Sequence, residues 1–251
     1  MVLFRTLASL MTLTSVSLDP AKAETWKIAA PEWPPYASAT LAKNGKAIAA
    51  LRNALAKAGI DLKVEFMPWT RAQTVAGSPD YTGYFPAWPE EVLDGFTASD
   101  PVAWSMVGIA QRSDTTIEWS TLEDLFLNYR VGFVKTYVYP SDMQRQIYRY
   151  YDPDDGAENE QDLARVLAAG RVDVALTDPI VMLHTAQDLS LDGIDETVTI
   201  LQRHPLVLAF TKHGNYEDKL RLLNGLLSEN SITETACCRT TQPTSEVQPS
   251  D

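Results

Sequence analysis

The sequence predicts an α/β fold in which buried strands alternate with amphipathic helices. Apolar residues that alternate with polar ones indicate strands, and apolar residues three and four positions apart indicate helices. The two patterns alternate from Trp26 onward, and the series starts afresh at Thr121. Such alternation is typical of parallel sheets covered by helices on both faces. A chain of 251 residues is long enough for one large domain or for two of about a hundred residues each.

The first series of elements ends with a strand at 105–111. A helix is predicted at 46–58 because its apolar residues have helical spacing and Gly59 follows them. Pro34 and Pro35 force an extended loop before that helix. The predicted strands are 26–30, 62–66, 81–85 and 105–111, and the predicted helices are 46–58 and 70–76.

The second series contains a junction that fixes the place of Asp178. The strand predicted at 172–176 ends just before Asp178, which is a favoured N-cap for a helix that begins with Pro179. Asp178 therefore lies at the carboxyl end of a buried strand. The other predicted strands are 130–134, 197–201 and 206–210, and the other predicted helices are 122–129, 141–150, 160–169 and 216–228.

The composition argues against several classes of partner and cofactor. The chain has 21 basic and 33 acidic residues, and a surface with a formal net charge of −12 repels nucleic acid. The histidines have no metal-ligand spacing and there is no CxxC or HExxH motif, so we expect no metal and no cofactor. Cys237 and Cys238 are adjacent in a polar terminal stretch and cannot join distant parts of the fold. Residues 237–251 are predicted to be a disordered tail.

The first 23 residues have the order of a secretory signal peptide. Arg5 precedes a mostly apolar run at 7–18, and Ala-Lys-Ala at 21–23 provides the small residues of a cleavage site. The run is shorter than the roughly 20 apolar residues that span a bilayer. We therefore expect cleavage before Glu24 and a periplasmic protein of a Gram-negative type of cell. A buried N-terminal helix is the alternative.

The candidate binding loops follow from the predicted sheets. Ligands of open α/β sheets bind beyond the carboxyl ends of the strands. The loops at that edge are 33–36, 68–71, 86–88 and 135–139, together with Asp178.

At these loops the sequence resembles the periplasmic solute-binding proteins of family 3, the amino-acid type, which deliver small polar solutes to ABC transporters. The resemblance covers most of residues 24–230 and depends on the order and spacing of short matching pieces. These pieces are 32–36, 66–72, 83–88, 99–101, 122–125, 131–134, 170–173, 177–178 and 208–212.

The resemblance implies a type II periplasmic-binding-protein-like fold with two lobes and two crossover strands as the hinge. Lobe one would comprise 24–109 and 208–236, and lobe two 110–207. Such lobes close over a ligand by a hinge motion. The implied partners are a small polar solute and the membrane permease of an ABC transporter, and the usual form in the family is a monomer.

Four aromatic residues in or beside the strand-end loops are candidate ligand contacts. Aromatic faces can cover the apolar part of a solute or hold an ammonium group, although core packing is the alternative role. The family position that matches Tyr36 is one wall of an aromatic clamp. The four candidates are Tyr36, Trp69, Phe85 and Trp88.

The charged candidates are Asp178, Glu32 and Arg71. Asp178 matches the family position whose carboxylate pairs with a ligand amine, a charge-assisted hydrogen bond, and the alternative role is a plain helix N-cap. Glu32 could serve in the same way. The planar guanidinium of Arg71 could bind a carboxylate, although a structural salt bridge is the more common role.

The sequence departs from the family pattern at two places that bear on the ligand. Amino-acid binders carry an arginine shortly after the third strand, but residues 88–93 contain none. The glycine-threonine turn that binds the ligand carboxylate is replaced by Lys135, Thr136 and Tyr137, which become candidate ligand contacts. Lys135, Thr136 or Arg71 would then have to compensate for the absent arginine. An ordinary α-amino acid is therefore in doubt, and an amine, a modified amino acid or a small peptide-like solute remains.

The sequence thus predicts a binding protein for a small amino-acid-like or amine solute, with no catalytic residues. One alternative is a dehydratase-like periplasmic enzyme on the same scaffold, with Glu32 or Asp178 as general acid. The other alternative is a sensing module that presents its closed form to a membrane receptor.

Overall fold

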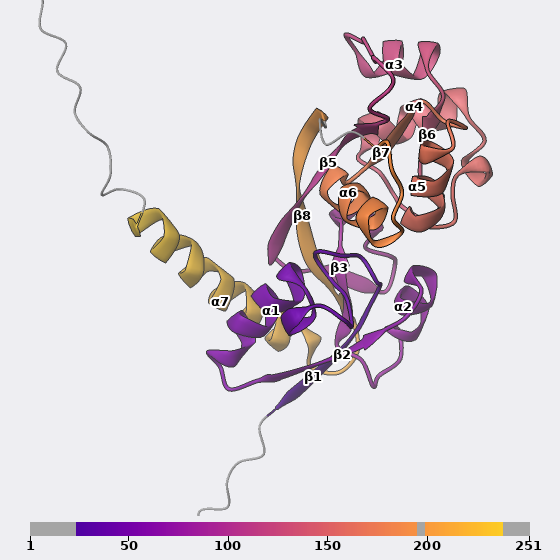
Figure 1. The fold of residues 1–251 in the computed structure, drawn as a ribbon. Helices are drawn as coiled ribbons and strands as arrows, with labels where there is room; N and C mark the ends of the chain where they lie inside the picture. The colour runs from indigo at the N-terminus through magenta and orange to yellow at the C-terminus, as the bar shows by residue number, and fades with distance from the viewer. Residues whose placement is uncertain (1–23, 195–198, 238–251) are drawn as a thin grey trace, which may run out of the picture.

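The computed structural model describes residues 24–194 and 199–237, with side chains described as far as residue 229. The predicted signal peptide and nearly all of the predicted tail lie outside these residues. In the described part of the chain, eight strands form one mixed sheet in the order β2-β1-β3-β8-β5-β7-β6, with β4 paired to β8. Figure 1 shows two groups of elements, one around β1 to β3 and one around β6 and β7, which β5 and β8 join.

The first group is built on three parallel strands. β1 pairs with β2 over its whole length and with β3 at two positions. Ile48, Leu51 and Leu55 of α1 are fully buried and belong to the same core as Trp26 and Ile28 of β1. The elements are β1 (Thr25–Ala30), α1 (Lys46–Ala56), β2 (Asp61–Phe66), α2 (Trp69–Val75), β3 (Gly83–Ala87), β4 (Phe96–Ala98) and α7 (Tyr216–Cys237).

The second group has a short parallel pair, β6 and β7, and β7 pairs antiparallel with β5. Met143 and Ile147 of α4 and Leu163 and Leu167 of α5 are fully or almost fully buried. The elements are β5 (Ala103–Gln111), α3 (Leu122–Asn128), β6 (Val131–Gly132), α4 (Ser141–Tyr150), α5 (Glu160–Ala168), β7 (Val174–Thr177) and α6 (Pro179–Asp188).

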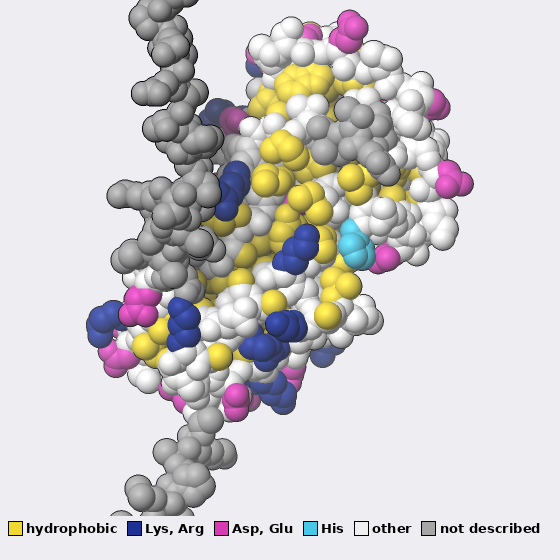
Figure 2. Space-filling model, turned by 60° about the vertical axis from the view of Figure 1, so that its left-hand side comes forward, with side chains coloured by type: hydrophobic (Ala, Val, Ile, Leu, Met, Phe, Trp, Pro, Cys, Tyr) yellow, Lys and Arg dark blue, Asp and Glu magenta, His cyan; other side chains and the backbone are white. Residues whose placement is uncertain are grey.

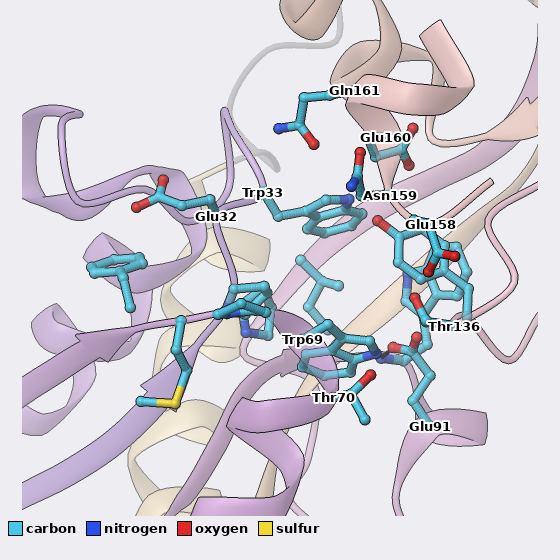
Figure 3. Close-up of a pocket in the computed structure, with 18 residues that line it drawn as sticks. Glu32, Trp33, Trp69, Thr70, Glu91, Thr136, Glu158, Asn159, Glu160 and Gln161 are labelled. Atoms are coloured by element: carbon cyan, nitrogen blue, oxygen red, sulfur yellow. Dashed lines mark hydrogen bonds between the residues drawn. The ribbon is translucent and has the colours of Figure 1, made fainter. Parts of the chain in front are cut away.

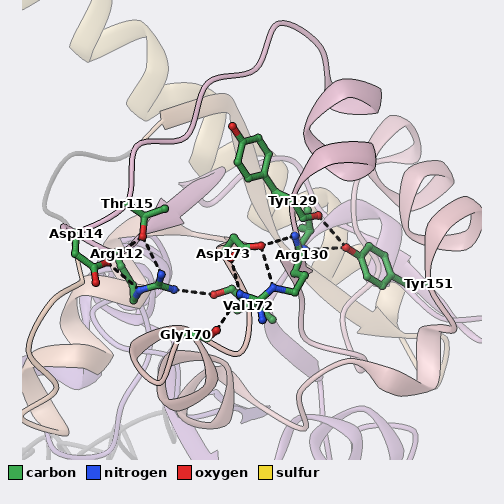
Figure 4. A network of polar contacts seen from close by, with 10 residues as sticks. Arg112, Asp114, Thr115, Tyr129, Arg130, Tyr151, Gly170, Val172 and Asp173 are labelled. Atoms are coloured by element: carbon green, nitrogen blue, oxygen red, sulfur yellow. Dashed lines mark hydrogen bonds and ion pairs between the residues drawn. The ribbon is translucent and has the colours of Figure 1, made fainter.

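An ionic network ties the strands of the second group together (Figure 4). Arg130 contacts Asp173 through its Nη2 atom at 2.6 Å, and the same nitrogen donates to the carbonyl of Gly170 at 2.9 Å. Arg112 at the end of β5 donates to the carbonyl of Val172 at 3.0 Å. The Gly-Arg-Val-Asp piece at 170–173 therefore has a structural role, because it fastens β6 and β7 to β5.

The connection between the two groups corrects the predicted strand pattern. Separate strands at 197–201 and 206–210 were expected, but β8 (Thr199–Thr211) is one strand of 13 residues, antiparallel to β3, β4 and β5. Proline is tolerated where one side of a strand lacks a partner, and the pairing of β8 with β3 begins at Val207, beyond Pro205. The all-parallel sheet that the alternation predicted is therefore interrupted by antiparallel crossover strands.

Most other predicted elements are present with small shifts at their ends. The helix predicted at 141–150 matches α4, and Asp178 caps α6 by accepting hydrogen bonds from the amides of Ile180 and Val181. β6 is shorter than the predicted 130–134, and α7 continues to Cys237, beyond the predicted end at residue 228. None of the helices in the described part of the chain combines the length and hydropathy of a membrane span.

The crossover strands expose apolar surface on one face of the molecule. Trp104 of β5 and Ile200 of β8 are 42% and 46% exposed, and Arg203 lies over the ring of Trp104. Figure 2 shows apolar side chains gathered across the middle of the molecule, between its two halves. The predicted lobe boundaries, 24–109 with 208–236 and 110–207, remain predictions.

Candidate functional site

A cavity of about 540 Å³ lies between the two groups of elements (Figure 3). The loops after β1, β2 and β3 line it from one side, and residues 136–137 and 158–161 line it from the other. Its volume is within the range of small-molecule sites, roughly 300 to 1,000 Å³. The lining residues are Pro31, Glu32, Trp33, Phe66, Met67, Pro68, Trp69, Thr70, Pro86, Trp88, Glu91, Thr136, Tyr137, Glu158, Asn159, Glu160, Gln161 and Leu206.

Aromatic rings form much of the cavity wall, and neighbouring side chains hold them in place. Trp33 stacks on Tyr36 with ring centroids 4.8 Å apart and meets Trp88 edge-on at 6.2 Å. Trp88 donates a hydrogen bond from Nε1 to the hydroxyl of Ser105 at 2.9 Å and meets Tyr137 edge-on at 5.7 Å. These contacts hold the rings of the wall in fixed positions in this structure.

Glu91 is a buried carboxyl group that faces the cavity. It is the last residue of the 3₁₀ turn Pro89–Glu91, and its Oε2 atom accepts a hydrogen bond from the amide of Trp88 at 2.9 Å. Burial raises the pKa of Glu91 to about 8, and the backbone amides of Trp88 and Val138 oppose this rise. Figure 3 shows the indole of Trp69 pointing toward this carboxyl group.

Glu160 is a second buried carboxyl group, on the opposite side of the cavity. It is the first residue of α5 and is 4% exposed, and its Oε1 atom accepts a hydrogen bond from the hydroxyl of Thr177 at 2.6 Å. Burial raises the pKa of Glu160 to about 7; Thr177 opposes the rise and the charge of Asp178 adds to it. Its Oε2 atom has no hydrogen-bond partner among the described residues.

Two buried indole N–H groups accompany these carboxyl groups. Nε1 of Trp33 and Nε1 of Trp69 make no hydrogen bond of normal geometry within the described residues. They nevertheless lie near enough to Glu160 and Glu91, respectively, to favour the ionised carboxylates and so to lower the two pKa values. The site therefore combines indole rings and carboxyl groups as neighbours.

Half of the ten residues predicted from the sequence line this cavity. Glu32 and Thr136 come from opposite sides of it, and the three aromatic residues form part of its wall. The structure therefore brings together the loops that the strand ends predicted. The five residues are Glu32, Trp69, Trp88, Thr136 and Tyr137.

Asp178 and Tyr36 lie outside the lining. Asp178 is fully buried, caps α6 and accepts a hydrogen bond from the amide of Met106 at 2.8 Å. Burial raises the pKa of Asp178, and the nearby Tyr36 hydroxyl opposes this rise. In this structure the carboxylate of Asp178 serves the backbone, as the alternative N-cap role implied, and Trp33 stands in front of Tyr36 at the cavity wall.

The other three predicted residues also lie outside the lining. Phe85 is fully buried in the hydrophobic core, and Arg71 is an exposed residue of α2. Lys135 forms an ion pair with Glu158 at 2.5 Å. Neither basic side chain is among the lining residues. In this structure, therefore, neither Arg71 nor Lys135 takes the place of the arginine that amino-acid binders carry after the third strand.

Sequence reasoning missed several lining residues that carry the charge of the site. Glu91 lies in the segment that was noted only for its missing arginine, and of residues 158–161 only 160–161 were predicted, as the start of a helix. A usable signal was present, because Asn159 is a favoured N-cap and helix N-termini in α/β units lie at the same edge as the strand ends. The missed polar residues are Glu91, Glu158, Asn159, Glu160 and Gln161.

The arrangement can accept hydrogen bonds from a ligand and cover it with aromatic rings. Among the lining residues, Glu32, Glu91, Glu158 and Glu160 are ionisable acids, and none is Lys, Arg or His. In the described part of the chain, no three His, Cys, Asp or Glu side chains are grouped so as to hold a metal ion.

The chain was compared with protein families, curated sequences and solved structures. No family model and no curated sequence matches. A histidine kinase sensor domain with similarity to periplasmic binding proteins is 18% identical, with a TM-score of 0.65 over 85% of this chain and 92% of that chain. An ancestral arginine-binding protein bound to arginine is 20% identical, with a TM-score of 0.64 over 84% and 94%.

A third similar structure has a link to an enzyme. It is AncCDT-1, an ancestral amino acid-binding protein and a precursor of cyclohexadienyl dehydratase, which is 19% identical, with a TM-score of 0.60 over 84% of this chain and 91% of that chain. At these identities the likeness concerns the fold. The chain has the two-lobe α/β fold of type II periplasmic binding proteins, as its sequence predicted.

Proposed function

We propose that this protein is a solute-binding protein that captures a small polar compound, amino-acid-like or an amine, in the cavity between its two halves. The observation that carries the proposal is the composition of the cavity wall, which combines fixed aromatic rings with buried carboxyl groups and is built from both sides. Binding by burial between two lobes requires no bond-making residue. The amino-acid-binding proteins among the similar structures support this reading.

We further propose that the protein is exported to the periplasm and delivers its solute to the membrane permease of an ABC transporter. The signal-peptide pattern of the first 23 residues motivates the localisation. The alternative partner is a membrane receptor, and the histidine kinase sensor domain of similar fold favours that alternative. In both cases the binding step at the cavity is the same.

An enzyme is the second candidate, and a specific observation favours it. The pKa values of Glu91 and Glu160 are raised to about 8 and about 7, which suits a general acid near neutral pH. One of the similar structures is a precursor of a dehydratase. Under this reading one of the two carboxyl groups would protonate a leaving group of the bound solute.

A thermal-shift screen distinguishes these functions. The purified chain is heated with amino acids, polyamines, small peptides and organic acids, because a compound that binds the folded state raises the melting temperature. We expect a stabilising compound that is recovered unchanged and whose effect is lost in Trp33→Ala. Trp104→Ala is the matched control, since Trp104 is an exposed tryptophan outside the cavity lining. Recovery of a product would favour the enzyme, and no shift with any compound would contradict solute binding.

A further inference from the structure

The charges that line the cavity are all of one kind. The ionisable lining residues are Glu32, Glu91, Glu158 and Glu160, and the nearby ammonium group of Lys135 is already paired with Glu158. A ligand carboxylate would enter this cavity without a cationic partner among the lining residues. Such an uncompensated burial of charge is strongly unfavourable.

The N-terminus of α5 is also unsuited to an anion. Helix N-termini bind anions through free backbone N–H groups and a positive dipole. Here the Asn159 side chain accepts a hydrogen bond from the amide of Asp162, and the chain's own Glu160 and Asp162 occupy the first turn. The positive end of the helix dipole is therefore already balanced by acidic side chains of the protein itself.

The carboxyl group of Glu160 has an unused hydrogen-bonding position. Its Oε2 atom is buried without a hydrogen bond of normal geometry among the described residues, although the Tyr137 hydroxyl and the Trp33 indole lie near the carboxylate and Glu160 lines the cavity. A buried acceptor without a donor is costly, and an N–H group of a ligand would satisfy it. The charge that best matches a carboxylate in a desolvated site is a cation with N–H donors.

Indole rings lie beside both buried carboxyl groups. Trp33 is near Glu160 and Trp69 is near Glu91, and both tryptophans line the cavity (Figure 3). Tryptophan is the aromatic side chain that attracts cations most strongly through its ring face. A cation in this cavity would meet aromatic surface and negative charge together.

We propose that the solute is an organic cation without a carboxylate, an amine or guanidine compound held by Glu160 and Glu91 and covered by Trp33 and Trp69. This inference depends on the proposed binding function and names its substrate class. The proposed ligand class differs from free α-amino acids. The cavity lining offers carboxyl groups to a ligand's cationic group, but it contains no Lys, Arg or His to pair with a ligand's carboxylate.

Arginine and agmatine test the inference, because agmatine is arginine without its carboxylate. Isothermal titration of the purified chain at pH 8 compares this pair, and putrescine and choline serve as further carboxylate-free cations. We expect at least one of the three carboxylate-free cations, agmatine, putrescine or choline, to bind. If agmatine binds, it should bind at least about tenfold more tightly than arginine, because burying the unpaired carboxylate of arginine costs more than about 1.4 kcal/mol. This comparison uses the unaltered protein and is independent of any variant's folding.

A variant locates the binding cation in the cavity. Glu160→Gln keeps the shape and removes the charge, and we expect it to weaken cation binding by about tenfold or more. Glu118→Gln, which removes an exposed carboxylate outside the lining, leaves the affinity unchanged. Circular dichroism of each variant confirms that it is folded.

The possible results separate the two proposals. Tighter binding of arginine than of agmatine, or binding only of neutral or anionic compounds in the screen, overturns the cation proposal and leaves solute binding intact. Cation binding that Glu160→Gln does not weaken also overturns it. If no compound of any class binds, both proposals fail.

Discussion

The buried carboxyl group of Glu160 makes the stability of the unliganded protein depend on pH in a way that a single substitution removes. The pKa of this group is raised from 4.5 to about 7 in the folded protein, so the folded state holds a proton that the unfolded state releases above pH 4.5. The stabilisation by this proton is complete below pH 4.5 and is lost as the pH rises through 7. One pKa unit corresponds to about 1.4 kcal/mol, so the loss is roughly 3 kcal/mol.

Glu160→Gln imitates the protonated side chain at every pH. The amide oxygen of glutamine can still accept the hydrogen bond from Thr177. We therefore expect the variant and the wild type to have similar free energies of unfolding at pH 4.5, and the variant to be more stable by up to about 3 kcal/mol at pH 8.5. Glu91 titrates in both proteins, so its contribution cancels in the difference.

Urea unfolding followed by tryptophan fluorescence at pH 4.5, 6.5 and 8.5 measures this difference. Glu118→Gln is the control, because Glu118 is exposed, and its stability should follow the wild type at each pH. A difference between Glu160→Gln and wild type that stays constant from pH 4.5 to 8.5 would refute the reasoning. The same variant should bind the cation more weakly, so a gain in stability and a loss of affinity are expected together.

Three further outcomes follow from the structure. The affinity for a bound cation should rise at least about tenfold between pH 6 and pH 8, because Glu160 ionises in this range and Glu91, whose pKa is about 8, adds to the rise. Titration calorimetry at each pH measures the affinity, and an unchanged affinity would exclude these carboxyl groups as partners. Gly83→Ala should destabilise the fold by about 1–3 kcal/mol in urea unfolding, because its Cβ would lie 1.9 Å from the carbonyl oxygen of Ala209, and a neutral result would contradict the close approach of β3 and β8. Asp178→Ala should lower stability by about 1–3 kcal/mol through loss of the α6 cap and the bond to Met106; a normal melting temperature with lost solute binding would instead support a direct ligand role.

Local patterns were sufficient for most of the elements and for the edge of the sheet that holds the site. The N-cap at Asp178 and the helix at 141–150 depend on residues a few positions apart, and both are present in the structure. Within each group the strand-end loops share one edge, because the carboxyl ends of parallel strands lie together. The two groups meet at the cavity only through the antiparallel strands β5 and β8 that join them.

Local patterns misled where distant pairing decides the outcome. His204 and Pro205 look like a break between two strands, but the long ladder with β5 carries β8 through them. β-strand formation depends on the neighbouring strand more than on the local sequence. Propensity along the chain therefore could not identify the length of this crossover strand.

By itself, the sequence determined the α/β class, the order of most elements and several of the strand-end loops that line the cavity, since these follow from periodicity, caps and turns. Only the tertiary structure decided that Trp33 rather than Tyr36 faces the cavity, that Asp178 is committed to backbone amides, and that Glu91 and Glu160 are buried there. The physical reason is that burial and the direction of a side chain depend on elements far away in the sequence. The charge of the site, and with it the class of solute we propose, is therefore a property of the packed fold.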